Sequence, residues 1–127
     1  MKLLAIALGG AAGSLARFGL GGLVQRLAPD HLPLGTLAVN VLGCLVMGAV
    51  GALFLGPYPI RDTLRIGVVV GLLGGFTTYS SFAWQTYELA AAGRWTLAAA
   101  NILLTNLSCL AGVWLGVRVC HALLPVR

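Results

Sequence analysis

Charged residues are scarce in this chain. Three acidic and eight basic side chains occur among 127 residues, so charged residues make up 9% of the composition. Hydrophobic residues make up 59%, and the mean hydropathy is +0.96. A water-soluble domain of this length keeps much of its surface in water and needs polar side chains there. The scarcity of charge therefore argues against an ordinary soluble domain and indicates that lipid surrounds the protein.

The positions of the few polar groups argue against several functions. The basic residues are scattered near the ends of apolar runs and form no stripe with interleaved aromatics, so we expect no nucleic-acid partner. Cys44, Cys109 and Cys120 show no metal-ligand spacing, and we expect neither a disulfide nor zinc. No catalytic triad or phosphate loop is visible, and no carboxylate lies deep in an apolar run. The sequence predicts that the protein is not an enzyme, and it argues against a proton-coupled pump.

Four apolar segments are long enough to cross a bilayer, which takes roughly 20 residues in a helix. Backbone groups in lipid must pair within their own segment, so the segments should be α-helices. The first segment resembles a signal peptide, but its apolar stretch continues past Arg17 to Val24, and we expect a retained helix. The sequence thus predicts one all-α integral membrane domain over residues 1–127, with helices at about 3–27, 33–56, 63–91 and 95–123.

Three of the predicted helices carry glycines at four-residue spacing. Small residues at this spacing let the backbones of membrane helices approach closely. The sequence therefore predicts glycine-mediated helix contacts at three sets of positions: Gly9 and Gly13; Gly67, Gly71 and Gly75; and Gly112 and Gly116.

The distribution of Lys and Arg gives only a weak orientation signal. With four spans, Lys2, Arg61, Arg65 and Arg127 share one side of the membrane, and Arg26 and Arg94 lie on the other. Since the Lys and Arg bias normally sets orientation, a modest bias permits insertion in both directions. We therefore expect an antiparallel, dual-topology dimer.

The third segment carries the most informative pattern. Two adjacent glycines, Gly74 and Gly75, lie near its middle and precede a run of hydroxyl residues around one aromatic. Glycine pairs loosen a helix, and Thr and Ser hydroxyls compete for backbone partners. A helix break at mid-membrane would free carbonyl oxygens that suit a small cation such as Na⁺. The pattern also fits a kinked packing helix whose hydroxyls bond to their own chain, and spacing alone slightly favours this second interpretation.

Other polar and aromatic side chains lie within the segments, and each permits two interpretations. Tyr79 and Phe82 share a helix face, where their positive ring edges could guide an anion or simply pack. Asn40, one turn after Thr36, is a double donor that could bind an anion or join two helices. A similar choice applies to the fourth-segment stripe of Asn101, Thr105 and Ser108. Arg17 could attract an anion, although pinning helix ends is the favoured role.

Several blocks of the sequence resemble the small Fluc (CrcB-like) fluoride channels, and the likeness covers nearly the whole chain. The matching blocks, in order, are Gly9-Gly10-Ala11-Ala12-Gly13-Ser14-Leu15-Ala16-Arg17-Phe18, then Gly35-Thr36-Leu37-Ala38-Val39-Asn40 with Gly43, then Gly74-Gly75-Phe76-Thr77-Thr78-Tyr79-Ser80-Ser81-Phe82.

The resemblance implies an antiparallel homodimer with two pores along its interface. It also implies a structural Na⁺ at the centre, held by backbone carbonyls that match Gly74 and Thr77. The implied pore-lining residues are Asn40, Tyr79, Ser80, Ser81 and Phe82, with Thr105 and Ser108 as candidates on the fourth helix.

Two departures from the family pattern concern conduction. Tyr79 replaces the usual first Phe, and Gln85 replaces a usual Glu near the pore mouth. The resemblance implies passive, selective fluoride export across the plasma (inner) membrane, which protects the cell from fluoride. The alternatives are a four-helix exporter of small molecules, which would need an intramembrane carboxylate, and one partner of a two-chain fluoride channel. A non-transporting structural subunit would leave Asn40 and the hydroxyl run unexplained.

Overall fold

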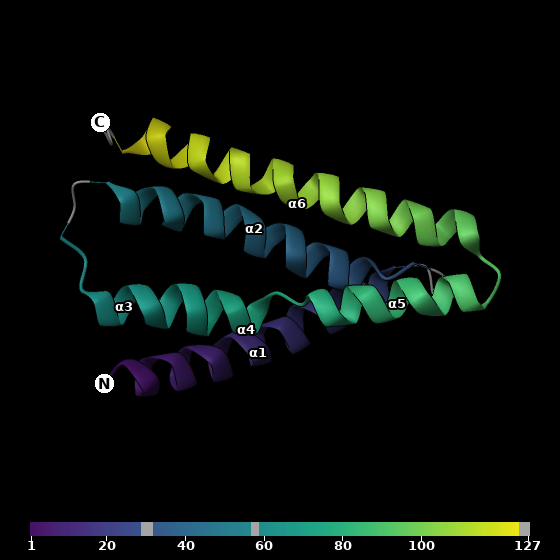
Figure 1. Cartoon of the computed structure of the whole chain (residues 1–127), viewed down its shortest axis with the longest axis horizontal. Coiled ribbons are helices and arrows are strands. Elements are labelled where there is room, and N and C mark those ends of the chain that lie inside the picture. Colours follow the sequence, from purple (N-terminus) through teal and green to yellow (C-terminus); the bar gives the residue numbers. More distant parts are fainter. Residues whose placement is uncertain (29–31, 57–58, 125–127) are drawn as a thin grey trace.

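The protein is a bundle of long helices in a computed structural model that describes residues 1–28, 32–56 and 59–124. Residues 29–31 and 57–58 of two predicted linkers, and Arg127, lie outside the described residues. The described elements, in chain order, are α1 (Lys2–Leu27), α2 (Leu34–Leu55), α3 (Asp62–Ile66), the π-helical stretch η1 (Gly67–Leu73), α4 (Gly74–Phe76), α5 (Tyr79–Ala91) and α6 (Trp95–Leu123) (Figure 1).

Four helical runs in the described chain are long and apolar enough to cross a membrane. They are α1, α2, the run from Asp62 to Ala91, and α6. The N-terminus, the start of α3 and the end of α6 lie at one end of the bundle, as an even number of crossings requires (Figure 1). Large apolar side chains such as Leu3, Phe18 and Leu55 are exposed along the outside. This exterior is suited to lipid or to a partner chain rather than to water.

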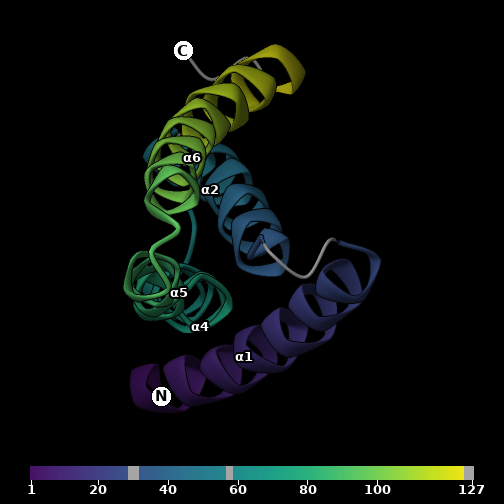
Figure 2. The same ribbon diagram turned by 90° about the vertical axis from the view of Figure 1, so that its right-hand side faces the viewer.

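The helices pack as two neighbouring pairs. α2 lies mainly against α6, and α1 lies mainly against η1 and α4 (Figure 2). The C-terminal half of α1 diverges from the third helical run and ends beside the start of α2. A cavity therefore lies between α1, α2 and α5. α5 and α6 join the pairs at the other end, where the chain turns through Gly93. Gly93 has φ of +73°, and glycine adopts this left-handed conformation without steric cost.

Glycine contacts explain how closely these pairs approach. A Cβ at Gly75 would lie 2.6 Å from the Gly10 carbonyl oxygen, and a Cβ at Gly13 would lie 2.9 Å from the Phe76 nitrogen. Between α2 and α6, a Cβ at Gly116 would lie 2.8 Å from the Ala49 nitrogen. Atoms at these distances overlap, so a larger residue would force the helices apart. The glycine spacing in the sequence correctly predicts these close contacts.

Candidate functional site

The third helical run is interrupted by two residues in extended conformation. α4 ends at Phe76 and α5 begins at Tyr79, while Thr77 has ψ of 157° and Thr78 has φ of −149°. The Thr78 hydroxyl caps α5 by accepting a hydrogen bond from the Ser81 amide at 3.2 Å. Thr77 remains bonded to the preceding turn, since its amide and its hydroxyl each donate to the Leu73 carbonyl at 3.0 Å. The hydroxyl of Thr77 thus bonds to its own chain, as the packing interpretation of this segment predicts.

Asn40 of α2 bridges to this interruption. Its Nδ2 donates to the Thr78 carbonyl at 3.0 Å, and its Oδ1 accepts from the Thr78 amide at 2.8 Å. Both residues are 7% exposed. The side-chain amide therefore pairs with both backbone groups of Thr78, and it replaces the Gly74 carbonyl as the partner of the Thr78 amide. Of the two roles the sequence permits for Asn40, the joining of two helices is present in the structure.

The same bonds deprive two carbonyl oxygens of their helical partners. In a continuous helix, the Gly74 carbonyl would accept from the Thr78 amide and the Thr77 carbonyl from the Ser81 amide. Here the first amide donates to Asn40 and the second to the Thr78 hydroxyl. Gly74 also lies exposed on the outside of the bundle. Two hard oxygen ligands are therefore available near the surface of this chain.

A cavity of about 260 Å³ lies on one side of the interruption, and we call it the aromatic cavity. The rings of Tyr79 and Phe82 lie against it, with centroids 5.2 Å apart and planes tilted by 59°. Phe82 is 5% exposed and fixed in the core, whereas Tyr79 is 75% exposed on the open face. The cavity is lined by Asn40, Gly43, Cys44, Met47, Thr77, Thr78, Tyr79, Phe82, Thr105, Asn106 and Cys109.

This cavity brings together some of the predicted pore residues and leaves others apart. Asn40, Tyr79, Phe82 and Thr105 all line it, although they come from α2, α5 and α6. Ser108 does not line it; Asn106 and Cys109 do, because this side of α6 faces α2 and α5. Thr105 is thus the one member of the predicted stripe of Asn101, Thr105 and Ser108 that lines this cavity among the described residues.

A second cavity, of about 480 Å³, lies on the other side of the interruption, between α1, α2 and α5. We call it the polar cavity. Arg17, Thr36, Ser81 and Gln85 line it together, and Thr78 lines both cavities. It is lined by Ser14, Arg17, Phe18, Gly21, Gly22, Gln25, Gly35, Thr36, Val39, Thr78, Ser81 and Gln85.

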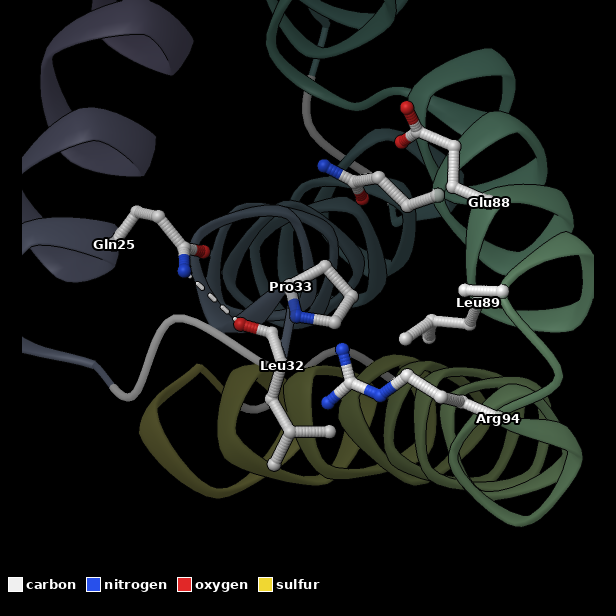
Figure 3. A pocket seen from close by; sticks show the side chains of 8 residues that line it. Gln25, Leu32, Pro33, Glu88, Leu89 and Arg94 are labelled. Atoms are coloured by element: carbon white, nitrogen blue, oxygen red, sulfur yellow. Dashed lines mark hydrogen bonds between the residues drawn. The ribbon is translucent and has the colours of Figure 1, made fainter.

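The polar cavity adjoins a third one of about 320 Å³ at the end of the bundle, the end cavity (Figure 3). Gln25 and Gln85 line both, while Glu88 and Arg94 line the end cavity alone. Gln25 also joins α1 to α2, because its Nε2 donates to the Leu32 carbonyl at 3.0 Å and its Oε1 accepts from the Gly35 amide at 3.0 Å. The two cavities thus share two polar lining residues and lie between the end of the bundle and Thr78.

Gln85 lines both the polar and the end cavities, and its buried Oε1 atom has no hydrogen-bond partner within the described part of the chain. A buried acceptor without a partner is costly.

Polar side chains join α5 to α6, and the sequence patterns do not predict this role for Thr86. Thr86 donates to the Phe82 carbonyl at 2.7 Å and accepts from Asn101 Nδ2 at 2.8 Å, which joins α5 to α6. The Thr105 hydroxyl donates to Asn101 Oδ1 at 3.5 Å. The role of Gln25 was also missed. A signal for it exists, because Arg17, Gly21 and Gln25 recur at four-residue spacing and so share one face of α1.

Known proteins resemble this chain over nearly its whole length. Residues 4–117 match the family described as "CrcB-like protein, Camphor Resistance (CrcB)". A relative from Geobacter metallireducens, called fluoride-specific ion channel FluC, is 42% identical over 97% of this chain and 99% of its own length. Relatives of the same name from Nitratidesulfovibrio vulgaris and Coxiella burnetii are 44% and 42% identical, covering 91% and 94% of this chain and 93% and 97% of their own lengths.

Proposed function

Because this chain belongs to the CrcB-like family, we propose that it is a fluoride-specific ion channel that lets fluoride leave the cell passively. Its relatives carry that name over nearly their whole lengths. The observation that carries the proposal within the chain is the Asn40–Thr78 bridge, which fixes an interrupted helix between two cavities. It is a multi-pass membrane protein, and we place it in the plasma (inner) membrane, where it protects the cell from fluoride.

The proposed route follows the two cavities and the residues between them. An anion enters through the end cavity and the polar cavity, where the Arg17 guanidinium supplies positive charge and Thr36 and Ser81 supply hydroxyl donors. It then passes Thr78 toward the aromatic cavity. There the second N–H of Asn40, the Thr105 hydroxyl and the positive ring edges of Tyr79 and Phe82 line the way. Ser80 and Ser108 extend this track toward a second chain.

Selectivity in this proposal comes from donors at close range. A fluoride ion must exchange its water shell for protein donors, as ions do in other selectivity filters. Most of the donors here are neutral, and only Arg17 carries a full charge among the polar-cavity residues. A narrow path lined in this way favours a small anion over chloride, which is larger. The inside-negative membrane potential drives export and contributes about 2.3 kcal/mol per charge per 100 mV.

The proposed assembly is an antiparallel homodimer. Its support is the exposure of Tyr79 and Gly74, together with that of large apolar side chains of α6 such as Leu103 and Leu107. An exposed polar aromatic and an open glycine backbone within membrane-spanning segments suit contact with a second copy better than contact with lipid. Among the described residues, Lys2, Arg61, Arg65 and Arg118 lie toward one end of the bundle, and Arg26 and Arg94 lie toward the other. This bias is modest, so it is compatible with insertion in both orientations.

The Gly74 and Thr77 carbonyls fit the structural Na⁺ of the proposed dimer. Both are hard oxygen ligands without their helical partners, and hard cations prefer such ligands. Two chains together would offer four of them. When bound, the ion supplies a fixed positive charge and joins the subunits.

The test of the proposed function is fluoride efflux from liposomes that contain only this purified chain, followed with a fluoride electrode. We expect fast fluoride release in the presence of Na⁺ and no chloride release under the same gradient. A well-folded protein that releases no fluoride would refute a self-sufficient channel. Restoration of efflux by a second, related chain would then identify the two-chain alternative. The small-molecule exporter has less support, since the segment from Leu3 to Val24 contains no carboxylate.

A further inference from the structure

Three sulfur-containing side chains gather at the aromatic cavity. Cys44 and Met47 come from α2, and Cys109 comes from α6. Cys44 and Cys109 line the cavity from neighbouring helices, and both cysteines are free. The proposed fluoride path does not use any of the three. Their meeting across two helices is a feature that the sequence spacing does not reveal.

The backbone holds these side chains in place. Cys44 and Met47 are three residues apart, so they share one face of α2. That face is turned toward α6, because a Cβ at Gly112, one turn after Cys109, would lie 3.6 Å from the Cys44 Cβ. The close glycine contacts at Gly48 and Gly116 keep α2 and α6 together just beyond this point. The two thiols therefore remain near each other without any movement of the backbone.

The chemistry of this cluster selects one class of ligand. Thiolates and thioethers are soft ligands and prefer Cu⁺ and similar metal ions, whereas Mg²⁺ and Ca²⁺ prefer oxygen. Within the described residues, no third His, Cys, Asp or Glu side chain joins the two cysteines in a group that could hold a metal ion, so a third ligand would have to be Met47. A free cysteine pair also packs well as two small apolar side chains. The shared cavity of about 260 Å³, which Met47 lines together with both cysteines, distinguishes this arrangement from packing alone.

We propose that Cys44, Cys109 and Met47 form a binding site for a soft, thiophilic monovalent metal ion, of which Cu⁺ is the expected ligand. The main copper–sulfur bond forms to the thiolate of one cysteine, and the thiol of the other cysteine and the Met47 thioether are weaker neutral ligands. One thiol loses its proton to water, and the resulting thiolate neutralises the charge of the ion. The uncharged complex is favoured within the membrane, where net charge is costly. No electron is transferred, and binding strengthens as the pH rises because a proton is released.

The test is Cu⁺ transfer to the purified full-length chain from a coloured bicinchoninate complex, under ascorbate and in detergent. We expect one Cu⁺ per chain. Cys44→Ser and Cys109→Ser should each lower the affinity by more than about tenfold, since even the loss of an outer-shell partner typically costs a metal site 10–100-fold. Met47→Leu should have a smaller effect. Cys120→Ser is the matched control, because Cys120 lies buried on the same helix but away from the cavity, and it should bind as the parent does.

A second measurement uses the native sequence and so does not depend on how the variants fold. Cu⁺ should protect Cys44 and Cys109 from alkylation by a maleimide, read by mass spectrometry of the peptides. Equal alkylation with and without Cu⁺ would overturn the proposal, as would parental Cu⁺ affinity in Cys44→Ser or loss of binding in Cys120→Ser. These assays measure copper and not fluoride, so their outcome is independent of whether the chain conducts.

Discussion

Replacing Asn40 by leucine tests whether the bridge to Thr78 holds the interrupted helix. Leucine keeps the approximate volume but removes both hydrogen bonds, at 3.0 and 2.8 Å, and leaves the buried N–H of Thr78 without its partner. Hydrogen bonds between membrane helices contribute on average about 0.6 kcal/mol and at most about 1.7 kcal/mol each. In a soluble protein, each buried unpaired group costs about 1–3 kcal/mol. We therefore expect Asn40→Leu to lower the free energy of unfolding by about 1–3 kcal/mol.

The assay is reversible unfolding in mixed micelles by titration with sodium dodecyl sulfate, followed by circular dichroism. Asn106→Leu is the control, because the Asn106 amide is exposed and donates to the Ile102 carbonyl of its own helix at 2.7 Å. This change should stay within about 0.5 kcal/mol. Equal unfolding free energies for Asn40→Leu and the parent would refute a structural bridge. If the protein is a channel, Asn40→Leu protein that still forms dimers should have lost fluoride efflux. If Asn40→Leu only prevents assembly, the result would favour a structural subunit.

Four further predictions concern packing, the path and the ion. Gly116→Ala should lower the free energy of unfolding by about 1–3 kcal/mol, because its new Cβ overlaps the α2 backbone. Gly51→Ala is the control, because its Cβ contacts no atom within 4 Å; it should leave the free energy of unfolding unchanged or raise it by up to about 1 kcal/mol. Tyr79→Phe should keep most of the fluoride efflux, since the positive ring edge remains. If this variant loses efflux, the phenol hydroxyl of Tyr79 is a required donor. Arg17→Gln should slow fluoride efflux about tenfold, which corresponds to roughly the 1.4 kcal/mol expected from one partly screened charge. Arg26 is exposed, and Arg26→Gln should leave the efflux rate unchanged. Equal efflux rates for Arg17→Gln and the parent would show that Arg17 is not on the path. Replacing Na⁺ with N-methylglucamine should weaken the dimer on size-exclusion chromatography, and an unchanged profile would count against a joining ion.

Much of the bundle follows from local patterns in the sequence. The apolar runs give the helices, and the four-residue glycine spacing gives the contacts of Gly13 with α4 and of Gly116 with α2. Gly93 is recognisable as a turn residue because it follows a helix and precedes Arg94 and a new apolar run. These features depend on residues close together in the chain, so periodicity is enough to reveal them.

The detail of the site depends on long-range contacts and is less accessible. Local composition draws attention to the glycine pair Gly74-Gly75, yet the extended residues are Thr77 and Thr78, because Asn40 from another helix pairs with the Thr78 backbone. Periodicity likewise groups Thr105 with Ser108, but it cannot show which side of α6 faces α2.

The pairing of α2 with α6 has a consequence for how the protein is made. α2 finds its main neighbour only when the last helix of the described chain has been synthesised, whereas α1 meets η1 and α4 much earlier. At about 5–20 residues per second, the 68 residues from Leu55 to Leu123 take several seconds. During this interval α6 does not yet cover the α2 surface at Gly48, which packs against Val113 in the finished fold, whereas the partner of Asn40 in the third segment is already present. The Asn40–Thr78 bridge is thus available to hold the second helix in position before its permanent partner arrives.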